Sequence, residues 1–270
     1  MRCQTGHFSL VLMSKFFDIH SHLNFPDYEK DFEEVITRLR ETRTHTIVVG
    51  TDYESSKKAV ELADKYEEIY ACIGVHPVDD PQKVWEEEKF ENLVRHPKVV
   101  AIGECGLDFF HADKAQDYER QKELFLAQVN FALKHDKPIM IHARNSYQEI
   151  IHILEQLGNP TSKLRGNVHF FAGDWEIAQR FLNIGFTFSF TGVITFTRDY
   201  DEVIKKAPLN MIMSETDAPF VAPAPYRGKR NEPSYVQGVV KKIAEIRGED
   251  FEIVRAQLVK NVYRMFNLEK

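Results

Sequence analysis

The sequence alternates short apolar runs with longer amphipathic stretches, and this alternation constrains the fold more than any other feature. Short apolar runs bounded by polar residues are typical of buried parallel strands, whereas apolar residues spaced three and four apart are typical of helices. We predict strands at residues 16–22, 46–50, 70–75, 99–104, 138–142, 167–171, 185–190 and 211–215. We predict helices at residues 31–44, 54–67, 83–95, 116–135, 146–157, 175–183, 200–206, 234–247 and 251–266.

Strands that each precede a helical stretch indicate an α/β protein with the (β/α)8 TIM-barrel architecture. The chain has 270 residues, a length that such a barrel often uses in one domain. No linker rich in Pro or Ser divides it, so we predict a single domain over residues 14–270. Residues 1–13 include a short apolar run without a small-residue cleavage site, and we expect them to be a disordered N-terminal extension.

The composition excludes some classes of protein. Lys and Arg number 35 against 41 Asp and Glu, a net charge of −6, which argues against a broad basic surface for nucleic acid. Cys3, Cys72 and Cys105 are widely spaced and suit neither a disulfide framework nor a zinc site, which favours a reducing cytoplasm. No apolar run approaches the length of a membrane span, and we expect a monomer without membrane contact.

Ionisable residues stand at the ends of the predicted strands. His20 and His22 are two residues apart, so in a strand both side chains point to the same face. In a TIM barrel the carboxyl ends of the strands converge on one mouth, where active sites are built. The strand ends bring six candidate metal ligands to that mouth: His20, His22, Glu104, His142, His169 and Asp217.

Each of these residues alone has a structural explanation, such as a buried hydrogen bond or a solvated loop position. Their joint convergence favours a metal site, because buried ionisable groups are costly unless they are paired or metal-bound. Six ligands suit two divalent ions that share a carboxylate, with Glu104 as the bridge. We predict that His20, His22 and Asp217 complete one ion and that His142 and His169 complete the other. Mixed imidazole and carboxylate ligands allow Mg, Mn, Zn or Co.

Several motifs resemble the TatD-type deoxyribonucleases, metal-dependent hydrolases of the amidohydrolase superfamily. The resemblance covers residues 14–268, with the motifs in the family's order. It is carried by Asp18-Ile-His-Ser-His-Leu23, Gly74-Val-His-Pro77, Gly103-Glu-Cys-Gly-Leu-Asp108, Pro138-Ile-Met-Ile-His-Ala-Arg144, Glu215-Thr-Asp-Ala-Pro219 and Arg227-Gly-Lys-Arg-Asn-Glu-Pro233. The chain departs from the family's pattern at Asn145, where Asp is usual, and at residues 170–173, where Cys and Ser are usual.

The resemblance implies a metal-dependent nuclease that hydrolyses phosphodiester bonds, commonly as a 3′→5′ exonuclease on DNA, with a part in DNA repair or breakdown. The expected substrate is single-stranded DNA or a DNA 3′ end, with RNA as an alternative. The family's metal ligands fall on the six residues derived above. Two ions would lower the pKa of a water and hold the phosphate oxygens. We predict catalytic roles for Asp217, which would orient or deprotonate that water, and for Glu104.

Other residues are candidates for contacts around the metal site. The predicted phosphate-binding residues are His76, Arg144, Arg227, Lys229 and Arg230, although a basic loop is often merely solvated. Asp18, Asp108 and Glu215 could orient the ligand histidines or make structural hydrogen bonds. Phe25, Phe109, Phe110 and Tyr226 could stack on bases or pack.

The remaining residues of interest have plainer interpretations. Cys105 is predicted to be a small packed residue rather than a nucleophile. We interpret His7, His45, His96, His111, His135 and His152 as surface residues.

Two other functions stay open. A small-molecule amidohydrolase or phosphoesterase could use the same scaffold, and the net charge mildly favours it. Such enzymes often carry a lysine as the bridging ligand, whereas here a glutamate takes that position. A non-catalytic binding protein is disfavoured because all six ligands are intact.

Overall fold

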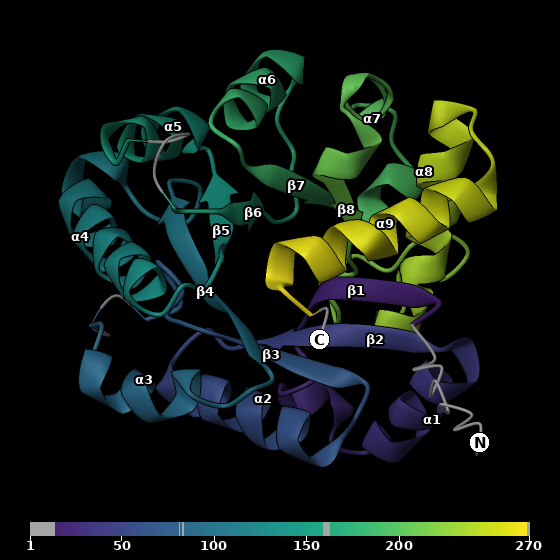
Figure 1. Ribbon diagram of the computed structural model, residues 1–270, viewed down its shortest axis with the longest axis horizontal. Coiled ribbons are helices and arrows are strands. Elements are labelled where there is room, and N and C mark those ends of the chain that lie inside the picture. The colour runs from purple at the N-terminus through teal and green to yellow at the C-terminus, as the bar shows by residue number, and fades with distance from the viewer. Residues whose placement is uncertain (1–13, 81, 83, 159–162, 269–270) are drawn as a thin grey trace, which may run out of the picture.

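The computed structural model describes residues 14–268 except 81, 83 and 159–162 (Figure 1). Its eight parallel strands follow one another around a single sheet in chain order, which confirms the predicted single-domain (β/α)8 barrel. The predicted N-terminal extension, residues 1–13, lies outside the described residues. The strands are β1 (Phe16–Ser21), β2 (Thr44–Val49), β3 (Ile69–Ile73), β4 (Val99–Asp108), β5 (Ile139–Arg144), β6 (Gly166–Val168), β7 (Thr187–Phe190) and β8 (Ile212–Ser214).

Helices form a ring outside the strands, as Figure 1 shows. The α-helices are α1 (Phe32–Thr42), α2 (Tyr53–Lys65), α3 (Glu87–Val94), α4 (Lys114–Lys134), α5 (Tyr147–Gln156), α6 (Trp175–Asn183), α7 (Asp201–Lys206), α8 (Val236–Arg247) and α9 (Phe251–Phe266). Four 3-10 turns are η1 (Pro26–Tyr28), η2 (Gly192–Thr195), η3 (Leu209–Met211) and η4 (Pro233–Tyr235).

Acidic residues begin several of these helices. The Asp52 side chain accepts a hydrogen bond from the backbone N–H of Ser55, and the Ser55 side chain returns the contact, which makes a capping box for α2. Asp113, Asp174 and Asp250 cap α4, α6 and α9 in the same sense. These caps satisfy N–H groups that have no partner within the helix, so the sequence itself defines where the helices start.

The barrel closes between β8 and β1 through few contacts. Ser21 forms an isolated parallel bridge with Ala218, and the Asp217 N–H donates to the His20 carbonyl over 2.9 Å. The buried Asp18 carboxylate adds two bonds, accepting from the Thr216 N–H at 2.8 Å and from its hydroxyl at 2.6 Å. The seam between first and last strand therefore depends on side chains next to His20 and Asp217.

The core has two parts. A large apolar cluster lies between the helices and the outer face of the strands, where Phe171 and Phe188 stack with ring centres 4.7 Å apart. A smaller cluster fills the barrel and includes Phe17 and Met140 together with Phe266 of α9. Figure 1 shows α9 reaching across to the middle of the barrel, so this helix covers the end of the barrel opposite the strand carboxyl ends.

Some predicted bounds were wrong. Strand β4 continues to Asp108, four residues beyond the predicted end, because Cys105 to Asp108 pair in register with β5. Strand β6 ends at Val168, so His169 follows the strand instead of lying within it. Helix α3 starts at Glu87, later than predicted.

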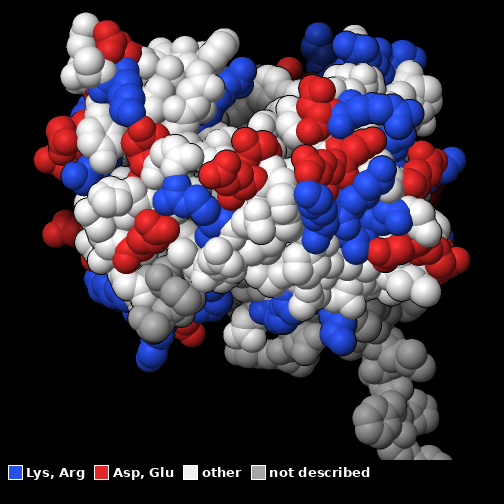
Figure 2. Space-filling model, turned by 90° about the horizontal axis from the view of Figure 1, so that it is seen from above, with Lys and Arg blue, Asp and Glu red and all other residues white. Residues whose placement is uncertain are grey.

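The surface of the described residues carries both signs of charge. On the face drawn in Figure 2, Lys and Arg side chains lie beside Asp and Glu side chains and form no continuous basic field among the described residues. None of the described helices is both long and apolar enough to cross a membrane.

Candidate metal centre

The first two predicted ligands lie at the carboxyl end of β1, with His20 in the strand and His22 directly after its last residue, Ser21. His20 is fully buried, and its Nε2 lies 3.3 Å from Nε2 of His22. The His22 Nδ1 lies 3.1 Å from the carbonyl of Val49, so this nitrogen donates its proton there. That bond leaves the His22 Nε2 lone pair free to face the cavity.

Glu104 stands between two pairs of histidines. Its Oε2 lies 3.3 Å from Nε2 of His20 and 3.9 Å from Nε2 of His22. Its Oε1 lies 2.7 Å from Nδ1 of His142 and 2.6 Å from Nε2 of His169. Each carboxylate oxygen therefore has its own set of imidazole nitrogens.

The backbone before Glu104 needs a glycine. Gly103 has a φ of +144°, and a Cβ added there would lie 2.4 Å from the Met140 carbonyl oxygen. Only a residue without a side chain allows β4 to approach β5 this closely. The close approach brings Glu104 within reach of His142 on β5.

Carboxylates behind the site hold the histidines on β5 and after β6. The Nε2 of His142 lies 3.0 Å from Oδ2 of Asp108. The Nδ1 of His169 lies 3.6 Å from Oε1 of Glu215, a fully buried carboxylate. Glu215 accepts from the Ser189 hydroxyl and the Phe170 N–H, each over 2.6 Å. Such partners fix the orientation and tautomer of ligating imidazoles.

Asp217 completes the constellation from the loop after β8. Its Oδ1 lies 3.5 Å from Nε2 of His22 and 3.8 Å from Nε2 of His20. Its backbone has a φ of +55°, an unusual conformation for a residue with a side chain. Asn231 fastens this turn, donating to the carbonyls of Thr216 at 2.9 Å and Phe220 at 2.6 Å.

The charge of the cluster is centred on Glu104. Burial raises the pKa of this carboxyl, but the imidazoles of His169 and His20 outweigh burial and hold the pKa well below its usual value. Burial lowers the pKa of His169, yet the facing Glu104 raises it well above its ordinary value. For His20, burial and the neighbouring His169 lower the pKa. Glu104 is therefore an ionised carboxylate at the centre of the site, and positive charge next to it is stabilising.

The donor set fits divalent cations. Three groups each have ligand atoms within 4.8 Å of one another: His20 with His22 and Glu104; His76 with Glu104 and His142; and His20 with His169 and Asp217. Two of these groups share Glu104 and otherwise use different histidines. Imidazole nitrogen and carboxylate oxygen are ligands that Zn, Mn and Co accept, and the carboxylates also suit Mg.

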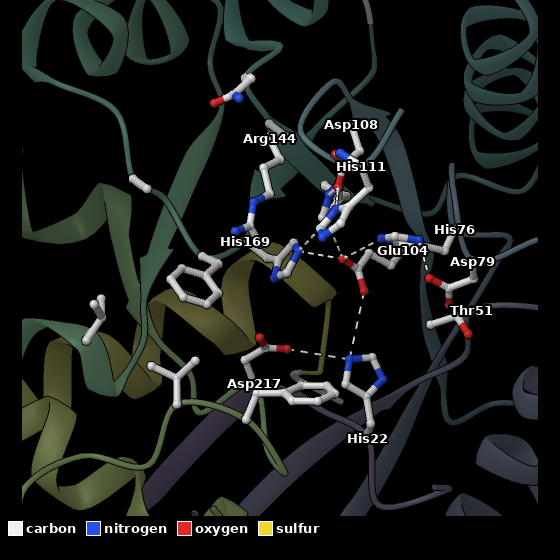
Figure 3. A pocket seen from close by; sticks show the side chains of 18 of the residues that line it. His22, Thr51, His76, Asp79, Glu104, Asp108, His111, Arg144, His169 and Asp217 are labelled. Atoms are coloured by element: carbon white, nitrogen blue, oxygen red, sulfur yellow. Dashed lines mark hydrogen bonds and ion pairs between the residues drawn. The ribbon is translucent and has the colours of Figure 1, made fainter. Parts of the chain in front are cut away.

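The predicted phosphate-binding residues separate into two sets. His76 and Arg144 line a cavity of about 770 Å³ above the six predicted ligands, and Figure 3 shows Arg144 extending toward His169. Arg227, Lys229 and Arg230 do not line it, among the described residues. Arg230 makes two bonds to Asp31, at 2.6 and 2.7 Å.

Several cavity residues escaped prediction from the sequence. Asp79 accepts from Nδ1 of His76 over 2.6 Å, and its position three residues after His76 was the available signal. His111 is exposed, as interpreted from the sequence, but it also lines the cavity, and its Nδ1 lies 2.8 Å from Oδ2 of Asp108. Phe220 also lines the cavity wall.

Of the other histidines interpreted as surface residues, three are only partly exposed. His45 is half-buried against Phe17 and Tyr70, at the barrel end away from the cavity. His96 and His135 are half-buried and face carboxylates of Asp64 and Glu91. His152 is exposed, whereas His7 lies outside the described residues.

The aromatic residues that were predicted either to stack on bases or to pack differ in whether they line the cavity. Phe25 stacks on His22 with ring centres 4.6 Å apart and lines the cavity, whereas Phe109 packs near Tyr118. Cys105 is fully buried, in agreement with its prediction as a packed residue.

A (β/α)8 barrel with histidines and carboxylates gathered at the carboxyl ends of its strands is the arrangement expected of a metal-dependent enzyme. Comparison with known proteins gives the family. The model of the family "TatD related DNase" matches residues 17–267, and the chain belongs to this family.

Individual relatives agree with this assignment. The uncharacterized metal-dependent hydrolase YabD of Bacillus subtilis is 40% identical over 256 residues, which cover 93% of this chain and 99% of the relative. The crystal structure of YjjV, a TatD homolog from Escherichia coli K12, is similar with a TM-score of 0.87 and 31% identity. That match covers 96% of this chain and 100% of YjjV. A TatD family hydrolase from Entamoeba histolytica, 24% identical, shares the fold with a TM-score of 0.81 over 93% of this chain and 97% of that one.

Proposed function

We propose that this protein is a metal-dependent nuclease that hydrolyses phosphodiester bonds in DNA, as a 3′→5′ exonuclease with two divalent ions. The ions are drawn from Mg, Mn, Zn and Co. The observation that carries the proposal is the position of Glu104, whose two oxygens face separate sets of imidazoles. A bridging carboxylate of this kind is what a pair of ions about 3.5–4 Å apart requires.

The six predicted ligands have distinct places in this proposal. His20, His22 and Asp217 would hold one ion and His142 and His169 the other, with Glu104 as the carboxylate that both would share. The bound ions supply positive charge that lowers the pKa of a water and neutralises the phosphate. His76 Nε2 lies 3.7 Å from Oε1 of Glu104, the oxygen that faces His142 and His169, so a phosphate bound by His76 would lie next to the second ion.

The remaining steps belong to side chains of the chain itself. Asp217 lines the cavity and is partly open to it, and we assign its carboxylate the role of orienting the attacking water and accepting its proton. Arg144 lines the same cavity and offers a planar donor set for the phosphate. His76, held by Asp79, faces the phosphate from the opposite wall.

The basic residues outside the cavity have a smaller role in the proposed substrate binding. Arg227 and Lys229 are exposed and are proposed to contact phosphates outside the cavity. Arg230 would have to give up its bonds with Asp31 to do the same.

The proposed setting follows from the same reasoning. The substrate is single-stranded DNA or a DNA 3′ end, with RNA as an alternative, and the cellular role is DNA repair or breakdown. We place the enzyme in the cytoplasm as a monomer, with residues 14–270 as the hydrolase domain and residues 1–13 as an extension to it.

The direct test is degradation of one single-stranded oligonucleotide labelled at either its 3′ or its 5′ end. Reactions contain added Mg or Mn, or EDTA, and Glu104→Gln serves as the variant of matched size. The expected result is metal-dependent loss of the 3′ label first, absent with Glu104→Gln. Metal-loaded protein that leaves both oligonucleotides intact would refute the proposal and favour a small-molecule amidohydrolase or phosphoesterase.

A further inference from the structure

The exposed aromatic rings of the described chain gather at one end of the barrel. Four such side chains are exposed: Phe110 at 60%, Phe220 at 51%, Tyr226 at 38% and Phe196 at 36%. All four lie in loops that follow β4, β7 or β8, the strands whose carboxyl ends open into the cavity. Exposed single apolar residues are common, but a set confined to the active-site end indicates a binding surface.

Two of these rings each have an arginine guanidinium lying over them. The guanidinium of Arg144 lies 4.3 Å from the ring centre of Phe110, and that of Arg227 lies 4.2 Å from the ring centre of Phe196. Neither arginine makes an ion pair with a carboxylate among the residues that the structure describes. By contrast, Arg230 is stacked on Tyr28 and also paired with Asp31. The first two arginines therefore keep their N–H groups available for another anion.

The two pairs stand on different sides of the cavity. Arg144 lines the cavity from β5, and the Phe110 loop follows the neighbouring strand β4. Phe196 follows η2, whose Val193 lines the cavity on the side of β7. The Ala224 N–H donates to the Thr195 hydroxyl over 2.9 Å, which joins the η2 segment to the loop that carries Arg227.

A phenylalanine with an arginine over it can bind both parts of a nucleotide. The ring and the guanidinium plane present faces on which a base can stack, and the guanidinium edge donates to a phosphate. Stacking of this kind needs an unpaired base, because the faces of paired bases are covered by their neighbours in the duplex. The cavity of about 770 Å³ has the size of a small-molecule site, which is enough for a mononucleotide at the end of a strand.

We infer that the pairs Phe110–Arg144 and Phe196–Arg227 are base-stacking sites that hold the unpaired end of a nucleic acid strand across the cavity mouth. This inference rests on the proposed function and adds to it the residues that select single-stranded substrate. The net charge of −6 agrees with recognition through two local pairs in place of a basic field.

The test compares two 3′-labelled oligonucleotides. One is an unmodified single strand, and the other has the same length with base-free sugars at its last three positions. The measured quantity is the ratio of kcat/KM for the two, determined for wild type, Phe110→Ala and Phe196→Ala. Leu133→Ala on the outside of α4, at 38% exposure, is the matched control. Phe110→Trp keeps an aromatic face at the first site.

The ratio is expected to fall about 5- to 150-fold in each alanine variant, from the strength of base–aromatic stacking. It should stay at the wild-type value in Leu133→Ala and recover in Phe110→Trp. An unchanged ratio in both alanine variants would overturn the inference while leaving the proposed function intact. An equal loss of kcat/KM on both oligonucleotides would also overturn it, because a purely structural role of the ring would not depend on whether the substrate has bases. Wild type that degrades neither oligonucleotide would instead refute the proposed function.

Discussion

Replacing Asp108 with asparagine should weaken one metal position and spare the other. The Oδ1 of Asp108 accepts from the backbone N–H groups of Phe110 and His111, each over 2.9 Å. Its Oδ2 faces Nε2 of His142 at 3.0 Å. The asparagine side chain in Asp108→Asn would keep the backbone bonds with its oxygen and turn its NH2 group toward His142.

That NH2 group changes the tautomer of the ligand. It can only donate, so His142 would have to accept at Nε2 and carry its proton on Nδ1, the atom that faces Glu104. A protonated Nδ1 cannot bind a metal. Loss of such an orienting partner typically costs 10- to 100-fold in metal affinity, which is about 1.4–2.7 kcal/mol.

The assay is calorimetric titration of metal-free protein with Mn²⁺. Wild type is expected to show two binding events, and Asp108→Asn should weaken one of them about 10- to 100-fold. His111→Ala is the matched control, since it removes the more exposed partner of the same carboxylate and should leave both events nearly unchanged. Equal affinities in Asp108→Asn and wild type, at equal thermal stability, would refute the tautomer argument.

Three further predictions concern the scaffold. Asn231→Ala removes the side-chain donor to the carbonyl of the buried Thr216 beside the Asp217 turn and should cost about 1–3 kcal/mol, measured by urea unfolding; a cost below about 0.5 kcal/mol would contradict it. Phe188→Ala empties a fully buried position against another ring and should cost about 3–5 kcal/mol by the same method; a Tm equal to wild type would count against the packing described. Cys72 and Cys105 are fully buried, so iodoacetamide should modify them only after denaturation, as peptide mass spectrometry can show; rapid labelling of either in the native protein would be inconsistent with the core.

The fold and the convergence of the six predicted ligands could be predicted from the sequence because both follow from periodicity. The alternation of apolar runs and helical stretches identifies the barrel, and barrel topology brings every strand's carboxyl end to one mouth. His20 and Glu104 are far apart in sequence, yet their Nε2 and Oε2 lie 3.3 Å apart. Barrel topology predicts this proximity without knowledge of any individual side-chain contact.

Loop residues were harder, because their partners depend on loop conformations that no period encodes. Arg230 was predicted to contact phosphate because its loop follows Asp217. In the structure its guanidinium instead donates to Asp31, on the other side of the seam between β8 and β1. The place of His111 at the cavity was not predicted because nothing in the sequence shows that β4 extends to Asp108. His45 packs against Tyr70 of the neighbouring strand β3, a contact that only the strand register reveals.

The most direct measurement of the central claim is hydrolysis of a 3′-labelled single strand while Mn²⁺ is added stepwise to metal-free protein. Wild type is predicted to become active as the added metal approaches two equivalents per chain, and Glu104→Gln to stay inactive throughout. Full activity in EDTA, or equal activity of Glu104→Gln and wild type, would contradict a nuclease built on this metal centre.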